Sequence, residues 1–311
     1  MQNEEEIVIK RKPKKVIEML LEDQWPVGSW GRRMIKYREK RGKKITEEVI
    51  HSISYTSMAM DVLLSYINIF PRKKERIQKS LNKALKWLLS RRLPDGSFWK
   101  YTITDAEGVS LPLSDVRHSA MAAYILMKIK GFDYWTVKAI RYIIEHQHPE
   151  GGWSMTLHAS PDIYSTYRTL MCLYLMFKNE EVYKHLELNE RFKVRNSISK
   201  AIEYLLRIHK NFLWEYNPPW SIYDTAMIIE GLTPLIQNDE YPEFKQFLKK
   251  VVRRILNLQL EDGSWGLREE DQEGSYESTL RVVAALSRLL KNNIFEDIEK
   301  DIIQALSKAL K

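Results

Sequence analysis

Gln147-His148-Pro149-Glu150-Gly151-Gly152-Trp153 is the stretch that decides the fold, because copies of it recur along the chain. Two more copies keep the glutamine, the glycine and the tryptophan: Gln24-Trp25-Pro26-Val27-Gly28-Ser29-Trp30 and Gln259-Leu260-Glu261-Asp262-Gly263-Ser264-Trp265. A fourth, Arg92-Leu93-Pro94-Asp95-Gly96-Ser97-Phe98, keeps the glycine, and Asn211-Phe212-Leu213-Trp214 keeps the tryptophan alone. A fixed phrase at wide intervals is typical of a repeat architecture. Five units therefore account for nearly the whole chain.

Each copy of this phrase, which we call a staple, follows a stretch with helical character, such as residues 134–146. The glycine is then expected to take the positive φ of a tight turn, and the glutamine amide to bond free backbone groups. The large aromatic side chain is expected to pack back on the neighbouring unit. The staples are thus predicted to join repeats and to have a structural role.

A second phrase lies between the staples and is followed each time by an apolar run too hydrophobic all round for a surface helix. Its copies are Tyr55-Thr56-Ser57-Met58-Ala59, Arg117-His118-Ser119-Ala120-Met121, Tyr164-Ser165-Thr166-Tyr167-Arg168, Tyr223-Asp224-Thr225-Ala226-Met227 and Tyr276-Glu277-Ser278-Thr279-Leu280. We expect five inner helices that begin with these phrases. Serine and aspartate before them, as at Ser114-Asp115, are typical helix-capping residues.

The helices that run into the staples, such as residues 72–90 and 244–258, carry charge on one face and are predicted to be outer helices. A last outer helix is expected near residues 295–310. Alternating outer and inner helices predict an all-α fold, an α/α toroid of six outer and five inner helices. The repeats run without a linker, so we expect one domain over residues 1–311, with a basic segment at residues 1–15.

The composition limits the size of the core and the cellular compartments in which the chain is expected. Its 311 residues are 44% hydrophobic, which is enough for a large core. No apolar run reaches the length of a membrane span, and the N-terminus lacks the features of a signal peptide. Cys172 is the single cysteine, which excludes disulfides within the chain and favours a cytoplasmic location.

The net charge of +8 is concentrated at Lys10–Lys15, Arg32–Lys44 and Pro71–Arg76. Such runs are solvated surface, or they face an anionic membrane, a nucleic acid or a diphosphate. Aromatic residues do not alternate with the basic ones as a platform for single strands requires, so nucleic acid is the disfavoured partner. Peripheral membrane contact through this basic N-terminal third remains an expectation.

At this point the residues resemble a known family. The staples are similar to the repeats of squalene–hopene cyclases and related class II terpene cyclases, and the inner phrases are similar to those enzymes and to protein prenyltransferase β subunits. Ser221-Ile222-Tyr223-Asp224-Thr225-Ala226 resembles the cyclase segment Asp-x-Asp-Asp-Thr-Ala. Residues 115–123 resemble the prenyltransferase segment Asp-x-Arg-x-Ser-x-x-Ala.

The chain departs from both families at the residues that do the chemistry. The resemblance implies that a cyclase protonates its substrate with the middle aspartate of Asp-x-Asp-Asp, but Tyr223 stands there and Ser221 replaces the first aspartate. A phenol is a poor acid for this task. The prenyltransferase zinc site would need Asp-x-Cys at the same place, and Cys172 has no partner at ligand spacing. His146-x-His148 has the spacing of a weak metal site, but it belongs to a staple, and no metal is expected.

The toroid implied by the resemblance would bring the N-termini of the inner helices to one mouth, which favours an anion there. Arg117, Arg168 and Arg281 are candidates for bidentate phosphate contacts, and His118 adjoins the first of them. The expected lining is a set of aromatic faces suited to an isoprenoid chain or a carbocation, the alternative being that these side chains only fill the centre: Tyr55, Tyr164, Tyr167, Trp220, Tyr223 and Tyr276.

Four carboxylates lie in the first turns of inner helices, where helix capping alone accounts for an acidic residue. Asp115 and Asp162 fit a capping role. Asp224 and Glu277 lie further into their helices and are the best candidates for an acid or a base, with Asp162 as the next candidate.

Three functions remain open. The first is an isoprenoid-handling enzyme resembling class II terpene cyclases, with a non-standard carboxylic acid, no cofactor, and Mg²⁺ where the substrate is a diphosphate. The second is a non-catalytic toroid that binds a lipid, a prenylated peptide, a protein partner or a second subunit. The third is a carbohydrate-active α/α toroid, which would need paired carboxylates across its cavity.

Overall fold

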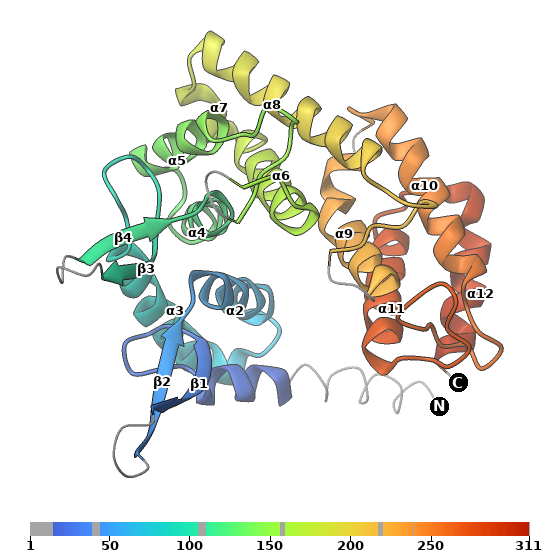
Figure 1. Ribbon diagram of the computed structural model, residues 1–311, viewed down its shortest axis with the longest axis horizontal. Coiled ribbons are helices and arrows are strands. Elements are labelled where there is room, and N and C mark those ends of the chain that lie inside the picture. Colours follow the sequence, from blue (N-terminus) through green and yellow to red (C-terminus); the bar gives the residue numbers. More distant parts are fainter. Residues whose placement is uncertain are drawn as a thin grey trace. The chain divides into compact units, whose positions relative to one another are not determined.

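The computed structural model describes residues 15–38, 44–104, 110–155, 159–216, 220–237 and 239–310. The basic N-terminal segment of the sequence analysis lies almost wholly outside these residues. The chain divides into two compact units, Met1–Ala139 and Ile140–Lys311. Figure 1 shows both, coloured along the sequence.

The N-terminal unit pairs helices with two hairpins. Residues 15–22 are helical. The elements that follow are β1 (Gly31–Arg38), β2 (Lys44–His51), α2 (Ile53–Tyr66), α3 (Lys74–Leu89), β3 (Trp99–Thr104), β4 (Ser110–Ser114), α4 (Val116–Lys130) and the start of α5 (Tyr134–Glu145). Helix α2 packs on α3 and α4.

The predicted all-α fold class is confirmed, and two short hairpins that the sequence analysis did not predict are added to it. Antiparallel β1 and β2 pair from Gly31 with His51 to Arg38 with Lys44, so the basic run at Arg32–Lys44 includes a strand. The strands β3 and β4 form a second antiparallel pair. Each hairpin lies between a staple aromatic and the next inner helix, and Ser52 N donates to Trp30 O at 3.0 Å where the first hairpin ends.

In the described residues of the C-terminal unit, the regular elements are helices. This unit contains the rest of α5, then α6 (Ile163–Phe177), α7 (Glu180–His185), α8 (Leu188–Arg207), α9 (Ser221–Ile236), α10 (Pro242–Asn257), α11 (Tyr276–Lys291) and α12 (Glu299–Ala309). Helix α9 packs against both α6 and α11 (Figure 1), and α10 contacts α8 and α12. The predicted outer helices at residues 72–90, 244–258 and 295–310 correspond to α3, α10 and α12.

The staple tryptophans are held by the same bonds in each repeat. Trp153 is fully buried, its Nε1 donates to Ile143 O at 2.9 Å, and its backbone N donates to Thr166 Oγ1 at 3.0 Å. Trp30, Trp214 and Trp265 repeat both bonds with a carbonyl nine or ten residues earlier and a threonine at the start of the next inner helix. The aromatic ring thus ties the helix before it to the helix after it.

The glutamine and the glycine of the staple reach the next outer helix, as the sequence predicted for their local roles. Gln147 Nε2 donates to Gly151 O at 2.6 Å and to Ser197 O of α8 at 2.8 Å. Gly151 has φ +101°, and a side-chain carbon there would collide with the backbone carbonyl of Lys200. Gln24 and Gln259 make the matching pair of bonds to α3 and α12.

The inner helices begin at side-chain caps. Asp115 accepts from His118 N, and Asp162 accepts from Ser165 N at 2.7 Å. Ser52 and Ser275 cap α2 and α11 in the same way. Helices α6 and α9 are buried over most of their circumference, as the apolar runs predicted.

In the described part of the chain, no helix is long and apolar enough to cross a membrane. Cys172 is buried in α6.

Candidate functional site

Several of the candidate residues in the C-terminal unit come together along α6, α9 and α11. Tyr164, Tyr167 and Arg168 are spaced so that they share one side of α6. We call these three residues, with Tyr216, Trp220, Tyr223, Glu230 and Arg281, the aromatic–arginine cluster. Asp162 is the N-cap of α6, so it fixes the residue at which this helix begins.

Arg168 is the cation of this cluster without an acidic partner. Its guanidinium lies 5.6 Å from the ring centre of Tyr164 and 5.2 Å from that of Tyr167. Its Nε is buried and has no hydrogen-bond partner. Among the residues that the structure describes, no carboxylate forms an ion pair with it. A charge in this setting is stabilised by aromatic faces and still lacks a counter-charge.

Tyr167 is fully buried beside Arg168, and its hydroxyl has no hydrogen-bond partner. Burial raises the pKa of Tyr167 well above its ordinary value, so the phenol stays neutral. Gly231 of α9 provides the space for the ring, because a side-chain carbon at Gly231 would lie 2.9 Å from it. A buried hydroxyl beside a cation that no described carboxylate neutralises can donate to an anionic or oxygen-bearing ligand.

Arg281 contrasts with Arg168 because it is neutralised. Its Nη1 donates to Glu230 Oε2 at 3.1 Å, and its Nη2 donates to Tyr223 Oη at 3.3 Å. Its guanidinium also lies 5.3 Å from the ring centre of Tyr223. Of the two cluster arginines, Arg168 is therefore the one without a described carboxylate partner.

The remaining rings extend the aromatic surface. Tyr164 stacks on Tyr216 with ring centres 5.3 Å apart, and Trp220 meets Tyr223 edge to face at 5.5 Å. Tyr164 and Tyr167 are also edge to face, at 5.4 Å. Aromatic faces in this number suit an isoprenoid chain or a developing carbocation.

The three candidate acids are all engaged with the protein. Asp224 is buried in the first turn of α9, and its Oδ2 accepts from Tyr216 N at 2.8 Å. Asp162 accepts from Ser165 N as a cap. Glu277 is exposed at the start of α11 and accepts from Ser275 Oγ at 3.1 Å. Asp224 is thus the buried member of this set.

Two predicted lining residues are largely exposed. Tyr276 is 73% exposed at the first position of α11, and Tyr55 is 49% exposed on α2. Tyr55 borders an open depression of about 940 Å³ between α2 and residues 16–31 of the N-terminal unit.

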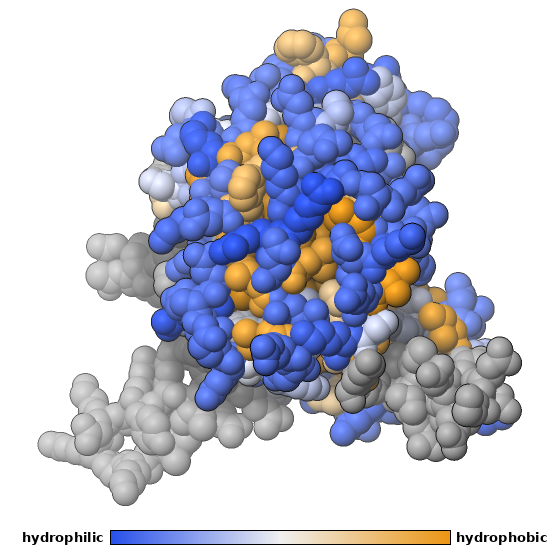
Figure 2. All heavy atoms as spheres, turned by 90° about the vertical axis from the view of Figure 1, so that its right-hand side faces the viewer, coloured by the Kyte–Doolittle hydropathy of each residue, from blue (hydrophilic) through white to orange (hydrophobic). Residues whose placement is uncertain are grey.

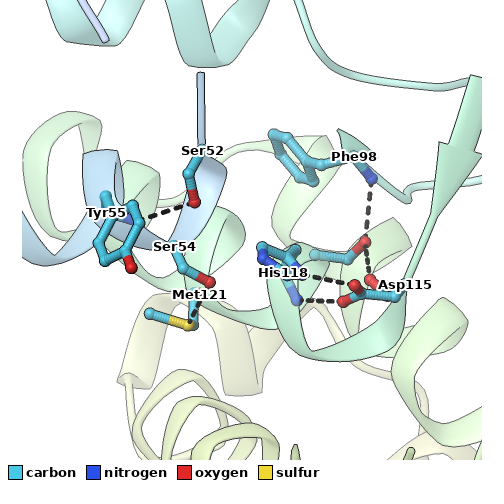
Figure 3. A network of polar contacts seen from close by, with 8 residues as sticks. Ser52, Ser54, Tyr55, Phe98, Asp115, His118 and Met121 are labelled. Carbon is cyan, nitrogen blue, oxygen red and sulfur yellow. Dashed lines mark hydrogen bonds and ion pairs between the residues drawn. The ribbon is translucent and has the colours of Figure 1, made fainter. Parts of the chain in front are cut away.

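Arg117 and His118 lie at the buried start of α4 in the N-terminal unit. His118 Nδ1 is 2.5 Å from Asp115 Oδ2, and His118 N donates to Asp115 Oδ1 at 2.7 Å (Figure 3). Ser119 Oγ accepts from Phe98 N in the same network. Asp115 therefore caps the helix and orients the His118 ring at once.

The histidines of the staple at residues 146–148 are also engaged. His146 Nδ1 donates to Tyr142 O at 2.8 Å, and His148 Nδ1 accepts from Glu150 N at 3.2 Å. Within the described residues, no group of three or more His, Cys, Asp or Glu side chains is arranged to hold a metal ion.

Sequence reasoning missed Tyr216 and Glu230. Tyr216 lies in the connection before α9, where no periodicity predicts its direction, and Glu230 lies among the apolar residues of α9. A charged residue inside a run predicted to be buried was the available signal for Glu230, since such a residue needs a partner.

Comparisons with known proteins bear on this architecture. A family model described as the prenyltransferase alpha-alpha toroid domain matches residues 3–207. No curated protein is significantly similar to the chain in sequence.

Solved structures share the fold at low identity. The type II terpene cyclase MstE from Scytonema is 15% identical, over 96% of this chain and 76% of that one, with a TM-score of 0.60. The ent-copalyl diphosphate synthase from Streptomyces platensis is 16% identical over 73% of this chain, with a TM-score of 0.51. The match covers 38% of the synthase, so this chain corresponds to well under half of it. The family model spans about two thirds of the residues, and the chain belongs to the prenyltransferase alpha-alpha toroid domain family.

Proposed function

We propose that the protein is an isoprenoid-handling enzyme of the terpene cyclase type. The observation that carries this proposal is Arg168, a cation without a carboxylate partner that lies against Tyr164 and Tyr167. Arg168 binds an anionic head group, such as a diphosphate, and the surrounding rings hold the prenyl chain. The likeness to MstE supports this class of ligand, because that protein has been solved with its substrate, geranylgeranyl dihydroxybenzoate.

In this proposal Asp224 transfers the proton. It is buried in the first turn of α9 and follows Tyr223 of the cluster directly. Its Oδ2 accepts from Tyr216 N at 2.8 Å, which holds the carboxyl group beside the connection that carries Tyr216 of the cluster.

Binding is tested with geranylgeranyl diphosphate, titrated with and without Mg²⁺ by calorimetry. Arg168→Gln removes the unpaired charge and is expected to weaken binding roughly tenfold to a hundredfold. Arg288→Gln is the matched control, because Arg288 is a half-exposed arginine of α11 whose nearest acid, Glu230, already has Arg281. Equal affinity of wild type and Arg168→Gln would contradict the binding proposal.

Catalysis is tested by mass spectrometry of the products. Asp224→Asn keeps the size of the side chain and removes the titrating proton, so formation of a cyclised product is expected to fall by about a hundredfold or more while binding survives. An equally active Asp224→Asn variant would assign the acid to Glu277 or Asp162 instead.

A second candidate function is non-catalytic binding of an isoprenoid lipid or prenylated peptide. It is favoured by one observation: each of the three candidate acids already accepts a hydrogen bond from the protein. Wild-type protein that binds the prenyl diphosphate tightly and returns it unchanged would support this function and exclude the cyclase proposal.

A further inference from the structure

Glu230 is an acidic residue on a helix that is otherwise mostly apolar and buried. The buried residues of α9 cover most of its circumference. The side of the molecule on which α10 and α12 lie in Figure 1 is mainly hydrophilic (Figure 2), as is usual for outer helices. A carboxylate on an inner helix is different, because its charge loses much of its hydration there and needs cationic partners.

Two arginines of α11 are the partners of this carboxylate. Glu230 Oε2 lies 3.1 Å from Arg281 Nη1, and Glu230 Oε1 lies 4.0 Å from Arg288 Nη1. The arginines are seven residues apart, which puts them on one side of α11. Each oxygen of the carboxylate therefore faces a different guanidinium, and one acid offsets part of the charge of both.

The second terminal nitrogen of Arg281 is also used within the protein, because Nη2 donates to Tyr223 Oη at 3.3 Å. Burial lowers the pKa of Arg281, but the interactions with Tyr223 and Glu230 outweigh burial and raise that pKa above its ordinary value. Arg281 therefore stays charged and has partners of its own. A head group that approaches Arg281 has to compete with both of them.

Arg168 and Arg281 nevertheless share a neighbourhood. Burial raises the pKa of the Tyr167 phenol, and both guanidinium groups oppose this rise, so Tyr167 lies within electrostatic reach of each. An anion beside Tyr167 is attracted by both arginines. The negative charge of Glu230 opposes that attraction at Arg281, whereas no described carboxylate opposes it at Arg168.

Charge decides which head group this arrangement accepts. A diphosphate carries several negative charges at neutral pH and a carboxylate only one, so repulsion by Glu230 acts more strongly on the diphosphate. A single guanidinium suits the two oxygens of a carboxylate. We propose, on the basis of the function proposed above, that Glu230 is a specificity-determining residue. It occupies the two arginines of α11, leaves Arg168 for the ligand, and makes the cluster prefer an isoprenoid carboxylate to an isoprenoid diphosphate.

The test is calorimetric titration, without Mg²⁺, of geranylgeranyl diphosphate, geranylgeranoic acid and uncharged geranylgeraniol. Wild type is expected to bind the acid more tightly than the diphosphate. Glu230→Gln keeps the size of the side chain and removes its charge, so the affinity for the diphosphate should rise at least about tenfold. The affinity for the acid should rise about threefold or less, because the Coulomb energy scales with the charge of the ligand, and geranylgeraniol should bind unchanged.

Glu240→Gln is the matched control, because Glu240 is exposed to a similar extent and pairs with Lys178 at 3.2 Å in the same unit. It should leave all three affinities unchanged. Glu230→Gln combined with Arg281→Gln keeps the net charge of the cluster and leaves no charge of this pair unpaired. This double variant should fold like wild type and lose the gain for the diphosphate.

The proposal is overturned if wild type binds the diphosphate more tightly than the acid, or if Glu230→Gln raises both affinities by the same factor. It is also overturned if the double variant keeps the gain, since the release of Arg281 is then not its cause. Wild type that binds none of the three ligands overturns the proposed function, and this specificity with it. Thermal unfolding verifies that each variant folds, and if Glu230→Gln does not fold, the preference of wild type decides.

Discussion

The staples at residues 147–153 and 211–214 both tie the helix before them to the helix after them, but they use different residues to do so. Trp153 and Trp214 are both fully buried, and each donates from Nε1 to an outer-helix carbonyl and from N to a threonine. The first staple adds a glutamine bonded to the next outer helix and a glycine pressed against it. The second has neither, and takes positive φ at Asn211 and Phe212. The tryptophan and its threonine are therefore what these two staples share, and the glutamine and glycine are replaceable.

Aromatic packing replaces the lost bonds in the second staple. His209 stacks on Phe212 with ring centres 5.2 Å apart, and both rings contact Phe247 of α10. Trp214 meets the same Phe247 edge to face at 5.6 Å. The contact to the next outer helix thus changes from polar to apolar while the position of the tryptophan is kept.

The largest expected effect is loss of the tryptophan in either staple. Trp153→Ala and Trp214→Ala should each lower the free energy of unfolding by about 3–5 kcal/mol, because both rings are fully buried. Urea denaturation followed by circular dichroism measures this. A Trp153→Ala protein that stays fully stable and loses activity alone would break the structural interpretation.

Loss of the threonine hydroxyl should come next. Thr166→Val leaves Trp153 N without its partner, while Trp153 O still accepts from Asp162 N, and should lower the free energy of unfolding by about 3 kcal/mol. Thr225→Val should have an effect at least as large, because Thr225 bonds both the N and the O of Trp214. Thr169→Val is the matched control on α6, because its buried hydroxyl has no partner and its loss should be neutral or stabilising. Equal effects at Thr166 and Thr169 would show that the threonine bond is not the shared element.

A smaller effect is expected at the glycine of the first staple. Gly151→Asn should cost about 2–3 kcal/mol. The φ of +101° lies beyond the left-handed region that asparagine tolerates, so the backbone angle and the collision with Lys200 O both contribute to this cost. Gly151→Ala, measured beside it by urea denaturation, should cost a similar amount, because its Cβ meets the same carbonyl.

The smallest effect is expected for the reverse change in the second staple. Asn211→Gly relieves a positive φ but removes an asparagine that accepts it well, so the free energy of unfolding should change by less than about 0.5 kcal/mol. A large gain in the same urea experiment would mean that the second staple is strained and that its aromatic contacts do not fully replace the glycine.

Much of the local structure was predictable because it depends on short spacings. The glycine angle, the glutamine bonds and the aspartate caps each involve residues within one turn or phrase. The hydroxyl residue shared by all five inner phrases was visible in the sequence, but its partner was not, since the bond from Trp153 N crosses a connection. The hairpins were not predicted, because the basic residues of Arg32–Lys44 were interpreted as a charged surface run and not as a strand.

The candidate site was predictable only where one helix carries it. Tyr164, Tyr167 and Arg168 follow from helical spacing. The pairing of Arg281 with Glu230 joins residues 51 apart on two helices, and it decides which arginine is neutralised. Periodicity shows which residues share a side of α9 or of α11, but not how the two helices are aligned with each other. The sequence therefore could not show that Arg281 pairs with a carboxylate and Arg168 does not.

The bond between staple and inner helix also has a kinetic consequence. In the C-terminal unit it closes loops of 13, 11 and 14 residues, whereas in the N-terminal unit, where the hairpins intervene, it closes loops of 26 and 21. The entropy of closing 26 residues rather than 11 costs about 0.8 kcal/mol more for a flexible chain. Because local contacts form early, the staples at Trp153, Trp214 and Trp265 should nucleate folding, and the two hairpin-bearing repeats should order after them.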